Sequence, residues 1–305
     1  MSAPKTSLQP HGEIDSKPKV VYGKGELLLR LGNGGAGATG LLEALANDYL
    51  STLPHPRSIT WVCNHSSNTQ LALFRGYIDL AFTYERDNES LAVSEGWSHT
   101  AGCVFHDHFC IAGPVSDPAG LRSVTSLGDA LRKIAKQNAS FHSRADGSAT
   151  MAKERGLWSA AGLQPWDSQD AAGWYKTSLD TPADALRRAD AAGAYLLTDR
   201  STVLRQTALR TISSTTVFIE PESLQDPLMN SCYALYSTSG AGERFGNIIH
   251  FLDYLFSDRG QNVTGSFGRD EAGLPFFATL KEGFAKTTLA GGMPKDGKWM
   301  SFSKL

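Results

Sequence analysis

The stretch ELLLRLGNGGAGATGLLEALANDYL, residues 26–50, predicts a strand, a glycine-rich turn and an amphipathic helix in immediate succession. Residues 26–31 form an apolar run typical of a strand, and the leucines after Gly40 recur with the spacing of one helical face. A strand over 58–63, a further helix and a strand over 78–84 repeat this order. Strands that alternate with amphipathic helices predict crossover connections, and therefore an α/β fold with mostly parallel sheets flanked by helices.

The composition is that of an ordinary folded protein. The chain has 305 residues, which suggests about two domains, and it is 41% hydrophobic, 20% charged and 10% aromatic. Its 29 basic and 31 acidic residues give a net charge of −2, without the clustered Lys and Arg that bind a phosphate backbone. No apolar run reaches the 18 or more residues that would span a bilayer. We therefore expect no nucleic-acid partner and no membrane insertion.

Further elements divide the chain into two lobes. The segment PVSDPAG after Gly113 has the turn chemistry of a domain crossing. Beyond it, Thr181-Pro182 predicts the start of a helix, because Thr is a good N-cap and Pro is favoured at the first helical position. Other helices are expected over 126–137, 150–161 and 245–256, and strands over 104–113, around 141, and over 194–198, 216–219 and 233–236. The predicted parts are a flexible N-terminal tail over 1–24, lobe I over 25–110, lobe II over 111–231, and the second part of lobe I over 232–305.

The N-terminus and the cysteines indicate a reducing compartment. The first 24 residues hold three prolines and lack both an apolar h-region and a small-residue cleavage site, so the sequence predicts no signal peptide and a cytoplasmic location. The four cysteines form no CxxC motif and are expected to be free thiols. They are Cys63, Cys103, Cys110 and Cys232.

Three loops between strands and helices are rich in hydrogen-bond donors. Small residues let successive backbone N–H groups converge on an anion, and an Arg guanidinium suits a desolvated oxyanion. The candidate ligand-binding residues are Asn33, Gly34, Gly35 and Ala36 in the first loop, Ser67, Asn68 and Thr69 in the second, and Ser143, Arg144, Ser148 and Thr150 in the third. Each loop also has a purely structural interpretation: a tight turn that binds nothing, helix capping by the second loop, and a surface loop held by an Arg144–Asp146 ion pair.

Other chemistry has weaker support. Gly32, Gly34 and Gly37 satisfy the spacing of a dinucleotide fingerprint, but no acidic residue ends the second strand, where a nicotinamide site needs one for the ribose. His106 and His108 share a strand face, yet no carboxylate lies at useful spacing, so we expect no metal site and no cofactor. The chain has no HExxH, GxSxG or P-loop motif, and we identify no catalytic residue. The adjacent Asp199 and Arg200 are expected to form a local ion pair.

The order of segments over about residues 26–278 resembles the type II periplasmic-binding-protein fold, specifically the tungstate-binding, TupA-type components of ABC importers. Residues 141–150, FHSRADGSAT, are similar to the family's Ser-Arg-Gly-Asp-x-Ser-Gly-Thr stretch, and residues 193–200, GAYLLTDR, are similar to its Gly-Ala-Tyr-Thr-Leu-Thr-Asp-Arg. Segments 109–120, 157–162 and 173–175 also match. The family's first loop carries a Thr-Thr-Thr-Ser run, whereas Asn33 to Ala36 stand here.

The resemblance implies a two-lobed fold with a ligand cleft between the lobes, and binding of a small oxyanion such as tungstate or molybdate. It implies a substrate-binding component of a transporter rather than an enzyme, with an ABC permease as partner by resemblance only, and an extracytoplasmic location. The alternative is a binding fold adapted to an organic anion or nucleotide-like ligand in an enzymatic or regulatory role. Trp61, Tyr84 and Trp174 are the candidate aromatic walls for such a ligand.

Overall fold

The computed structural model describes residues 5–167, 173–221, 223–238 and 244–285, together with short backbone segments at 289–290, 293–294 and 299–300. It divides into two compact units, described separately below. Unit 1 comprises residues 1–106, 147–149 and 231–267, and unit 2 comprises residues 107–146, 150–230 and 268–305. Strands β5 (Ser98–Pro114) and β10 (Met229–Ser237) each carry the chain from one unit into the other.

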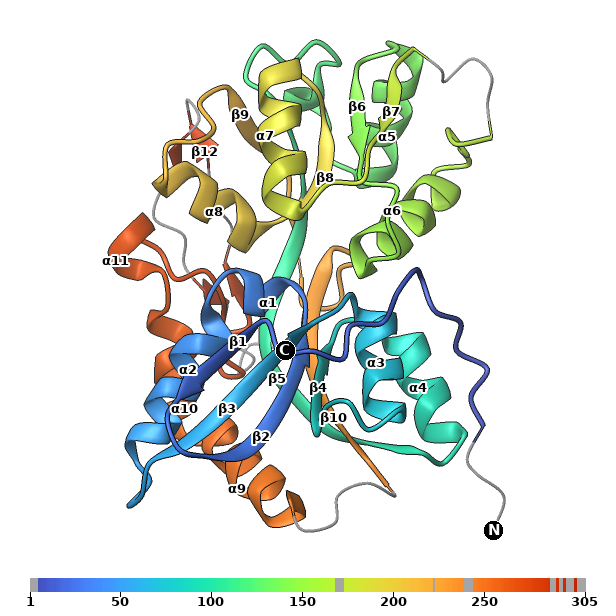
Figure 1. Cartoon of the computed structure of the whole chain (residues 1–305). Coiled ribbons are helices and arrows are strands. Elements are labelled where there is room, and N and C mark those ends of the chain that lie inside the picture. The colour runs from blue at the N-terminus through green and yellow to red at the C-terminus, as the bar shows by residue number, and fades with distance from the viewer. Residues whose placement is uncertain are drawn as a thin grey trace. The chain divides into compact units, whose positions relative to one another are not determined.

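The strands of unit 1 have the order β1-β3-β2-β4-β10 (Figure 1). Strand β2 runs parallel to β3 and β4, whereas β1 and β10 pair antiparallel with β3 and β4 respectively. Each of the strands predicted from the sequence in this part of the chain is present. The elements of unit 1 are β1 (Val20–Gly23), β2 (Glu26–Asn33), α1 (Gly35–Ala38), α2 (Leu41–Ser51), β3 (Arg57–Cys63), α3 (Ser66–Phe74), β4 (Leu80–Thr83), α4 (Arg86–Ser94), α9 (Phe245–Phe256) and α10 (Asp258–Ser266).

Helices cover both faces of this sheet, as the alternation of side chains along β3 shows. Successive residues of a strand point to opposite faces. Val62 packs in a buried cluster with Leu71 of α3, and its neighbour Trp61 lies against Gly37 of α1. An added Cβ on Gly37 would come within 2.2 Å of the Trp61 ring, so this close approach requires glycine.

The N-terminal segment, defined here as residues 5–19, is held against unit 1. The prediction of a flexible tail over residues 1–24 is corrected for these residues, whereas residues 1–4 lie outside the described ranges. Leu8 is buried in the cluster that contains Leu71 and Trp97. The Ser7 amide donates to Glu95 at 2.8 Å, and the Lys19 amide donates to the Trp61 carbonyl at 2.8 Å. Buried apolar area and specific hydrogen bonds thus offset the entropy cost of ordering this proline-containing segment.

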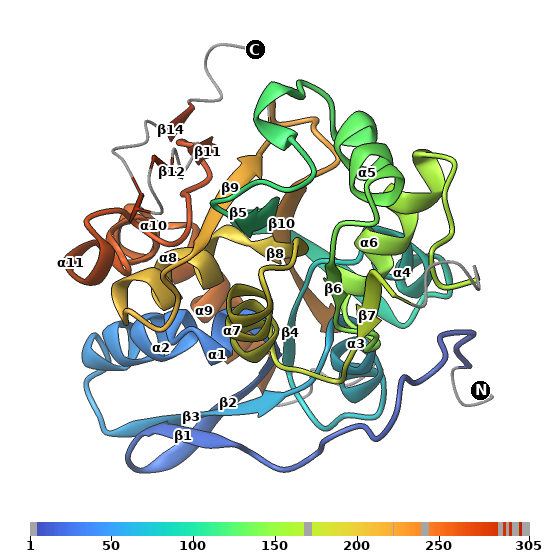
Figure 2. The ribbon, with the colours of Figure 1, turned by 90° about the horizontal axis from the view of Figure 1, so that it is seen from above.

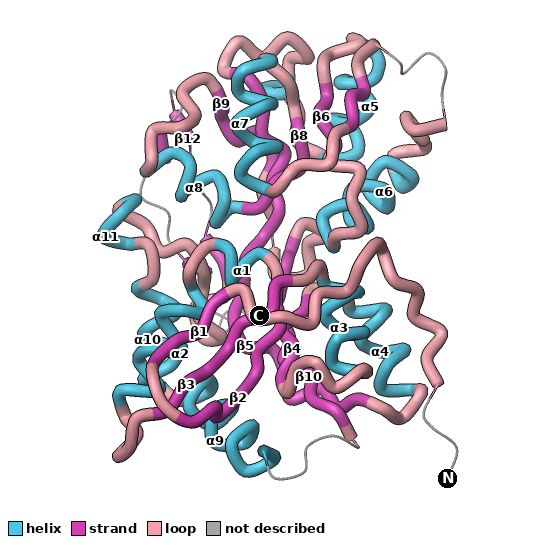
Figure 3. The backbone as a smooth tube through the Cα atoms, in the orientation of Figure 1, coloured by secondary structure: helices cyan, strands magenta, loops and turns pink. Residues whose placement is uncertain are grey.

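Unit 2 contains a second set of strands flanked by helices (Figures 2 and 3). Strand β5 pairs antiparallel with β8 and β9, and β6 pairs parallel with β7. The expectation of mostly parallel strands therefore holds for β6 and β7 but not for β5, whose partners β8 and β9 run in the opposite direction. The elements are η1 (Leu121–Ser123), α5 (Leu127–Lys136), β6 (Phe141–Ser143), α6 (Ala149–Ala160), β7 (Tyr175–Thr177), α7 (Pro182–Ala192), β8 (Leu196–Asp199), α8 (Arg200–Ala208), β9 (Thr215–Ile219), α11 (Arg269–Ala272), β11 (Phe284–Ala285), β12 (Leu289–Ala290), β13 (Met293–Pro294) and β14 (Trp299–Met300).

Strand β5 also divides the core of unit 2 into two clusters. Phe109 and Ile111 face one cluster, which α5 and α6 complete with residues such as Trp158. Cys110 and Ala112 face the other, which α7 and α8 complete. This alternation of apolar residues on both faces explains why the strand reads as a continuous apolar run in the sequence.

The end of the chain differs from the predicted division. We expected residues 232–305 to complete lobe I, but residues 268–305 group with unit 2. The buried Arg200 guanidinium explains the difference, because Nη1 donates to the carbonyl oxygens of Pro275 at 2.6 Å and Phe276 at 3.3 Å. Asp199 instead caps α8, accepting from the Thr202 amide at 2.8 Å. These two residues therefore serve different partners rather than the local ion pair that we expected.

Within the described ranges, the search for a helix long and apolar enough to cross a membrane found none. The four cysteines are free, as predicted; Cys110 and Cys232 are buried, and Cys63 and Cys103 are partly buried.

Candidate functional site

The first predicted loop offers backbone donors, because the side-chain amide of Asn33 is already hydrogen-bonded to the backbone of Gly37 and of Phe82 in β4. Asn33 is fully buried; its Oδ1 accepts from the Gly37 amide at 2.9 Å, and its Nδ2 donates to the Phe82 carbonyl at 2.8 Å. Gly34, Gly35 and Ala36 follow at the start of the short helix α1. The first N–H groups of a helix lack intrahelical acceptors, so these three amides are the donors that the loop retains.

Gly35 is the open point of this loop. It is exposed, and an added Cβ would meet no heavy atom within 4 Å. On Gly34, by contrast, a Cβ would come within 2.9 Å of the Asn64 carbonyl oxygen. A side chain is therefore tolerated at position 35 on packing grounds and would project into the space beside the loop.

The side chains of the second loop are committed to contacts within unit 1. They belong to the first turn of α3, whose N-cap is His65, and no side chain makes the capping hydrogen bond considered for this loop. Ser67 Oγ donates instead to Glu85 at 2.6 Å, and Thr69 Oγ1 donates to the Asn64 carbonyl at 3.0 Å. Both side chains are almost fully buried.

Asn68, the remaining residue of that loop, holds the N-terminal segment. Its Oδ1 accepts from the His11 amide at 3.0 Å, and its Nδ2 donates to the carbonyls of His11 at 2.9 Å and Glu13 at 3.0 Å. Asn64 makes the same kind of two-way contact with the Asp15 backbone, at 2.9 Å in each direction. Both carboxamides thus act as clamps for a chain segment, a role that the sequence did not suggest.

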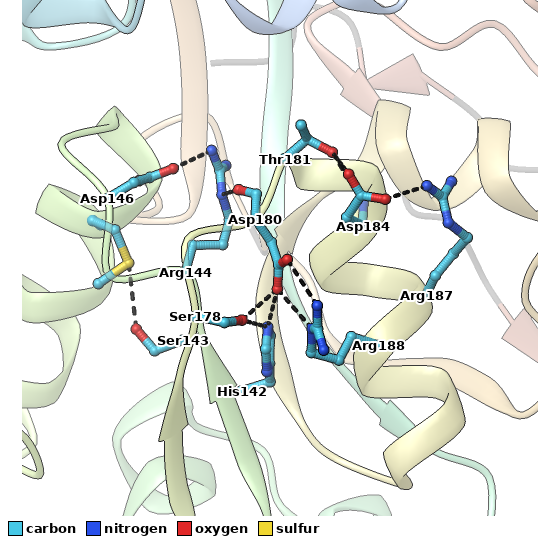
Figure 4. Close-up of polar contacts among 11 residues, drawn as sticks. His142, Ser143, Arg144, Asp146, Ser178, Asp180, Thr181, Asp184, Arg187 and Arg188 are labelled. Atoms are coloured by element: carbon cyan, nitrogen blue, oxygen red, sulfur yellow. Dashed lines mark hydrogen bonds and ion pairs between the residues drawn. The ribbon is translucent and has the colours of Figure 1, made fainter. Parts of the chain in front are cut away.

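The guanidinium of Arg144, in the third loop after β6, is buried and has three protein partners, of which Asp146 and Asp180 are drawn in Figure 4. Arg144 Nε donates to the Asp180 carbonyl at 3.1 Å, Nη1 lies 3.4 Å from Thr150 Oγ1, and Nη2 pairs with Asp146. Only 6% of Arg144 is exposed, so its orientation is fixed by protein groups and not by solvent. The Arg144–Asp146 pair considered from the sequence does form, but it is buried rather than on the surface.

The other predicted residues of this loop are also buried. Ser143 Oγ donates to the Met151 sulfur at 3.4 Å, and Ser148 and Thr150 are each 8% exposed. Ser148 belongs to the segment 147–149 that groups with unit 1, whereas Ser143, Arg144 and Thr150 belong to unit 2. The structure thus brings Arg144 and Thr150 together and places the first two loops in unit 1.

Asp180 is the residue that sequence reasoning missed. Its carboxylate accepts from Arg188 Nε at 2.9 Å and Nη2 at 3.2 Å, pairs with Ser178, and lies 3.2 Å from His142 Nε2 (Figure 4). The hydrogen bonds from Arg188, then Ser178, lower the pKa of this carboxyl to about 2. One indication of this residue was present in the sequence: Asp180 stands immediately before Thr181, the N-cap of α7. At this position its main-chain carbonyl accepts from Arg144 Nε.

No catalytic triad is formed by the side chains of Ser178, His142 and Asp180. Ser178 Oγ and Asp180 Oδ2 both lie 3.2 Å from the same ring nitrogen, His142 Nε2. A catalytic triad needs its hydroxyl and its carboxylate on opposite nitrogens of the imidazole. Burial lowers the pKa of His142, so the neutral ring is favoured, and the arrangement serves as a structural support beside Arg144.

A buried carboxyl lies near the same loop. Glu154 of α6 accepts from the Tyr175 hydroxyl at 2.7 Å, and burial raises its pKa to about 7.

His106, considered as a metal ligand from the sequence, contacts Ser231 Oγ at 2.7 Å through Nδ1, and His108 Nδ1 lies 3.0 Å from the Phe109 carbonyl. Among the residues that the structure describes, no group of three or more His, Cys, Asp and Glu side chains could hold a metal ion.

Comparison with known proteins identifies the class. Residues 20–259 match the family model described as a PBP superfamily domain, and the chain belongs to this family. A solved structure provisionally described as a periplasmic metal-binding protein is 28% identical, with a TM-score of 0.77 over 86% of this chain and 98% of that one. The type II binding-protein fold predicted from the sequence is therefore confirmed.

Two relatives are described as binding proteins for anions. The tungstate-binding protein TupA of Peptoclostridium acidaminophilum is 25% identical over 206 residues, which is 66% of this chain and 68% of that protein. A protein of Haloferax volcanii provisionally named an ABC transporter anion-binding protein is 35% identical over 129 residues. That second match covers 42% of this chain and spans only 36% of the Haloferax protein. The chain is thus a homologue of tungstate-binding and anion-binding proteins of ABC transporters.

Proposed function

We propose that this protein binds a small tetrahedral oxyanion, with tungstate or molybdate preferred over sulfate and phosphate, as a substrate-binding component. The observation that carries the proposal is the buried Arg144 guanidinium, oriented by the Asp180 carbonyl and the Thr150 hydroxyl. A planar guanidinium donates two parallel hydrogen bonds to an oxyanion, and a fixed orientation reduces the entropy lost on binding. The names of the relatives support the same ligand class.

The first loop supplies the second part of the proposed site. Backbone amides of Gly34, Gly35 and Ala36 would donate to the anion in place of the hydroxyl groups that TupA-type proteins carry there by resemblance. Convergent backbone N–H groups bind anions without a charged side chain. An ABC permease as partner, which the family resemblance implies, is part of this proposal.

The alternative of an organic ligand has less support from the aromatic residues named for it. Trp61 is 4% exposed and donates from Nε1 to the Asn33 carbonyl at 2.8 Å, and Trp174 lies in the core cluster around Trp158. The Tyr84 ring packs edge-on against Phe105. These rings are committed to packing within the units.

An anion panel with one pair of variants tests the proposal. Tungstate, molybdate, sulfate and phosphate are each added to the protein, and the melting temperature and the heat of binding are measured. A ligand at a hundred times its Kd stabilises the folded protein by about 2.7 kcal/mol, which corresponds to a shift of several degrees. We expect tungstate and molybdate to give the larger shifts, and equal or absent shifts for all four anions would contradict the proposal.

Gly35→Asp adds a negative charge at the open point of the first loop. We expect it to weaken tungstate binding at least tenfold while the protein folds normally, because the new side chain meets no neighbour. Gly156→Asp is the matched control: Gly156 lies on α6, is exposed, and likewise has no atom within 4 Å of an added Cβ. Parent-like affinity of Gly35→Asp would remove the first loop from the site.

A further inference from the structure

Nη2 of the Arg144 guanidinium is paired with a carboxylate from the same loop. Asp146, two residues further along the chain, forms an ion pair with Nη2, and the side chains of the two residues are 8% and 10% exposed (Figure 4). An oxyanion that uses both terminal nitrogens of Arg144 meets this carboxylate at one of them. The pair contributes no net charge, so Asp146 offsets the attraction that Arg144 alone would exert on an anion.

The backbone between the two residues is shaped for this contact. Ala145 has φ of 50°, in the left-handed region that residues with a side chain rarely adopt. Such a conformation is unfavourable for an alanine and persists only when its surroundings hold it. Asp146, at the start of the bend that follows, pairs with the guanidinium two residues before it.

Asp180, the other acidic residue beside Arg144, has a different role. Its carboxylate is neutralised by the two hydrogen bonds from Arg188, and only its main-chain carbonyl contacts Arg144. Asp180 therefore positions the guanidinium without competing for it. Asp146 is the carboxylate that an incoming anion would have to replace.

We propose that Asp146 is a specificity-determining residue of the oxyanion site: its carboxylate is the internal counter-ion of Arg144, and an oxyanion binds by taking its place. This inference rests on the proposed function. A tetrahedral dianion offers several acceptor oxygens and two charges, and can replace a carboxylate on a guanidinium. A planar monoanion such as nitrate carries half that charge and competes poorly with a carboxylate supplied by the same chain at high effective concentration.

Calorimetric titration of Asp146 variants tests the exchange. Asp146→Ala and Asp146→Asn should bind tungstate at least tenfold more tightly than the parent, and nitrate should compete with tungstate in both variants but not in the parent. Asp146→Glu keeps the carboxylate and should behave as the parent does. The control is Asp129→Asn on α5, where an exposed aspartate pairs with Arg132 at 2.7 Å, and its affinity should equal that of the parent.

The results distinguish an internal counter-ion from the other roles that Asp146 could have. Tightening in Asp146→Asn alone would mean that the new amide donates to the anion, and unchanged or weaker binding in Asp146→Ala would mean that Asp146 orients Arg144; either result overturns the inference. Because the parent binds tungstate in both of those cases, the proposed function survives them. If neither the parent nor any variant binds an oxyanion, both proposals fail. If only Asp146→Ala and Asp146→Asn bind, the internal counter-ion is supported in its strongest form.

Discussion

Removing the Arg144 side chain should destabilise unit 2, not only weaken ligand binding. Arg144→Ala leaves the Asp146 carboxylate 10% exposed without its cation and removes the donor to the Asp180 carbonyl. Truncating one partner of a buried ion pair costs about 3–5 kcal/mol, mainly because the remaining charge stays buried without that partner. Since proteins are stable by about 5–15 kcal/mol, the variant should still fold but unfold at clearly lower urea concentration.

A double-mutant cycle separates this pair from general effects of truncation. Arg144→Ala, Asp146→Ala and the double variant are unfolded in urea without added oxyanion, and circular dichroism follows the loss of helix. The double variant removes both charges, so its loss of stability should be smaller than the sum of the two single losses by about 1–3 kcal/mol. Additive losses, or a cost below about 1 kcal/mol for Arg144→Ala, would refute the buried pair and return Arg144 to a solvated loop.

Two further predictions concern unit 1. Burial lowers the pKa of His106 to about 4. As the pH falls below about 6.5, this histidine is therefore protonated in the unfolded chain before it is protonated in the folded protein. The free energy of unfolding should drop by about 2 kcal/mol between pH 7 and pH 5. His106→Asn should show a smaller drop in urea titrations at the two pH values, and an identical drop would contradict the assignment. Asn68→Ala removes the hydrogen bonds to His11 and Glu13, and hydrogen exchange of the amides over residues 7–15 should then become faster. Unchanged exchange would show that the other contacts of the segment, among them Leu8 and the Asn64 carboxamide, hold it without Asn68.

The elements of the fold were readable because their signals are local. The strand and helix of residues 26–50 follow from apolar spacing, and the Thr181 N-cap accepts from the Asp184 amide at 3.2 Å as its sequence predicts. The N-terminal segment could not be read in this way. Its anchors, Asn64 and Asn68, lie about fifty residues away, and nothing in a proline-containing stretch indicates which distant carboxamides will bind its backbone.

How the candidate site residues are used could not be predicted, for the same reason. Loop position and residue type placed Arg144 and Thr150 in one loop, where their side chains lie 3.4 Å apart, but they could not show how each donor is used. Asn33 and Ser67 carry suitable polar groups, yet the first ties its own loop to β4 and the second pairs with Glu85. A polar side chain beside a turn can hydrogen-bond to buried backbone groups as readily as it binds a ligand. No pattern in the sequence distinguishes these two uses.

This internal use of side chains determines where discrimination among anions can arise. In the first loop the amide of Asn33 is committed, so the donors that remain are backbone N–H groups, which bind any anion of suitable size. The charged and hydroxyl side chains of the proposed site belong to the Arg144 loop, which holds a fixed cation, a competing carboxylate and a hydroxyl at residues 144, 146 and 150. The choice between tungstate, sulfate and smaller anions should therefore follow substitutions at Asp146 and Thr150, while substitutions at Gly35 should weaken all of them alike.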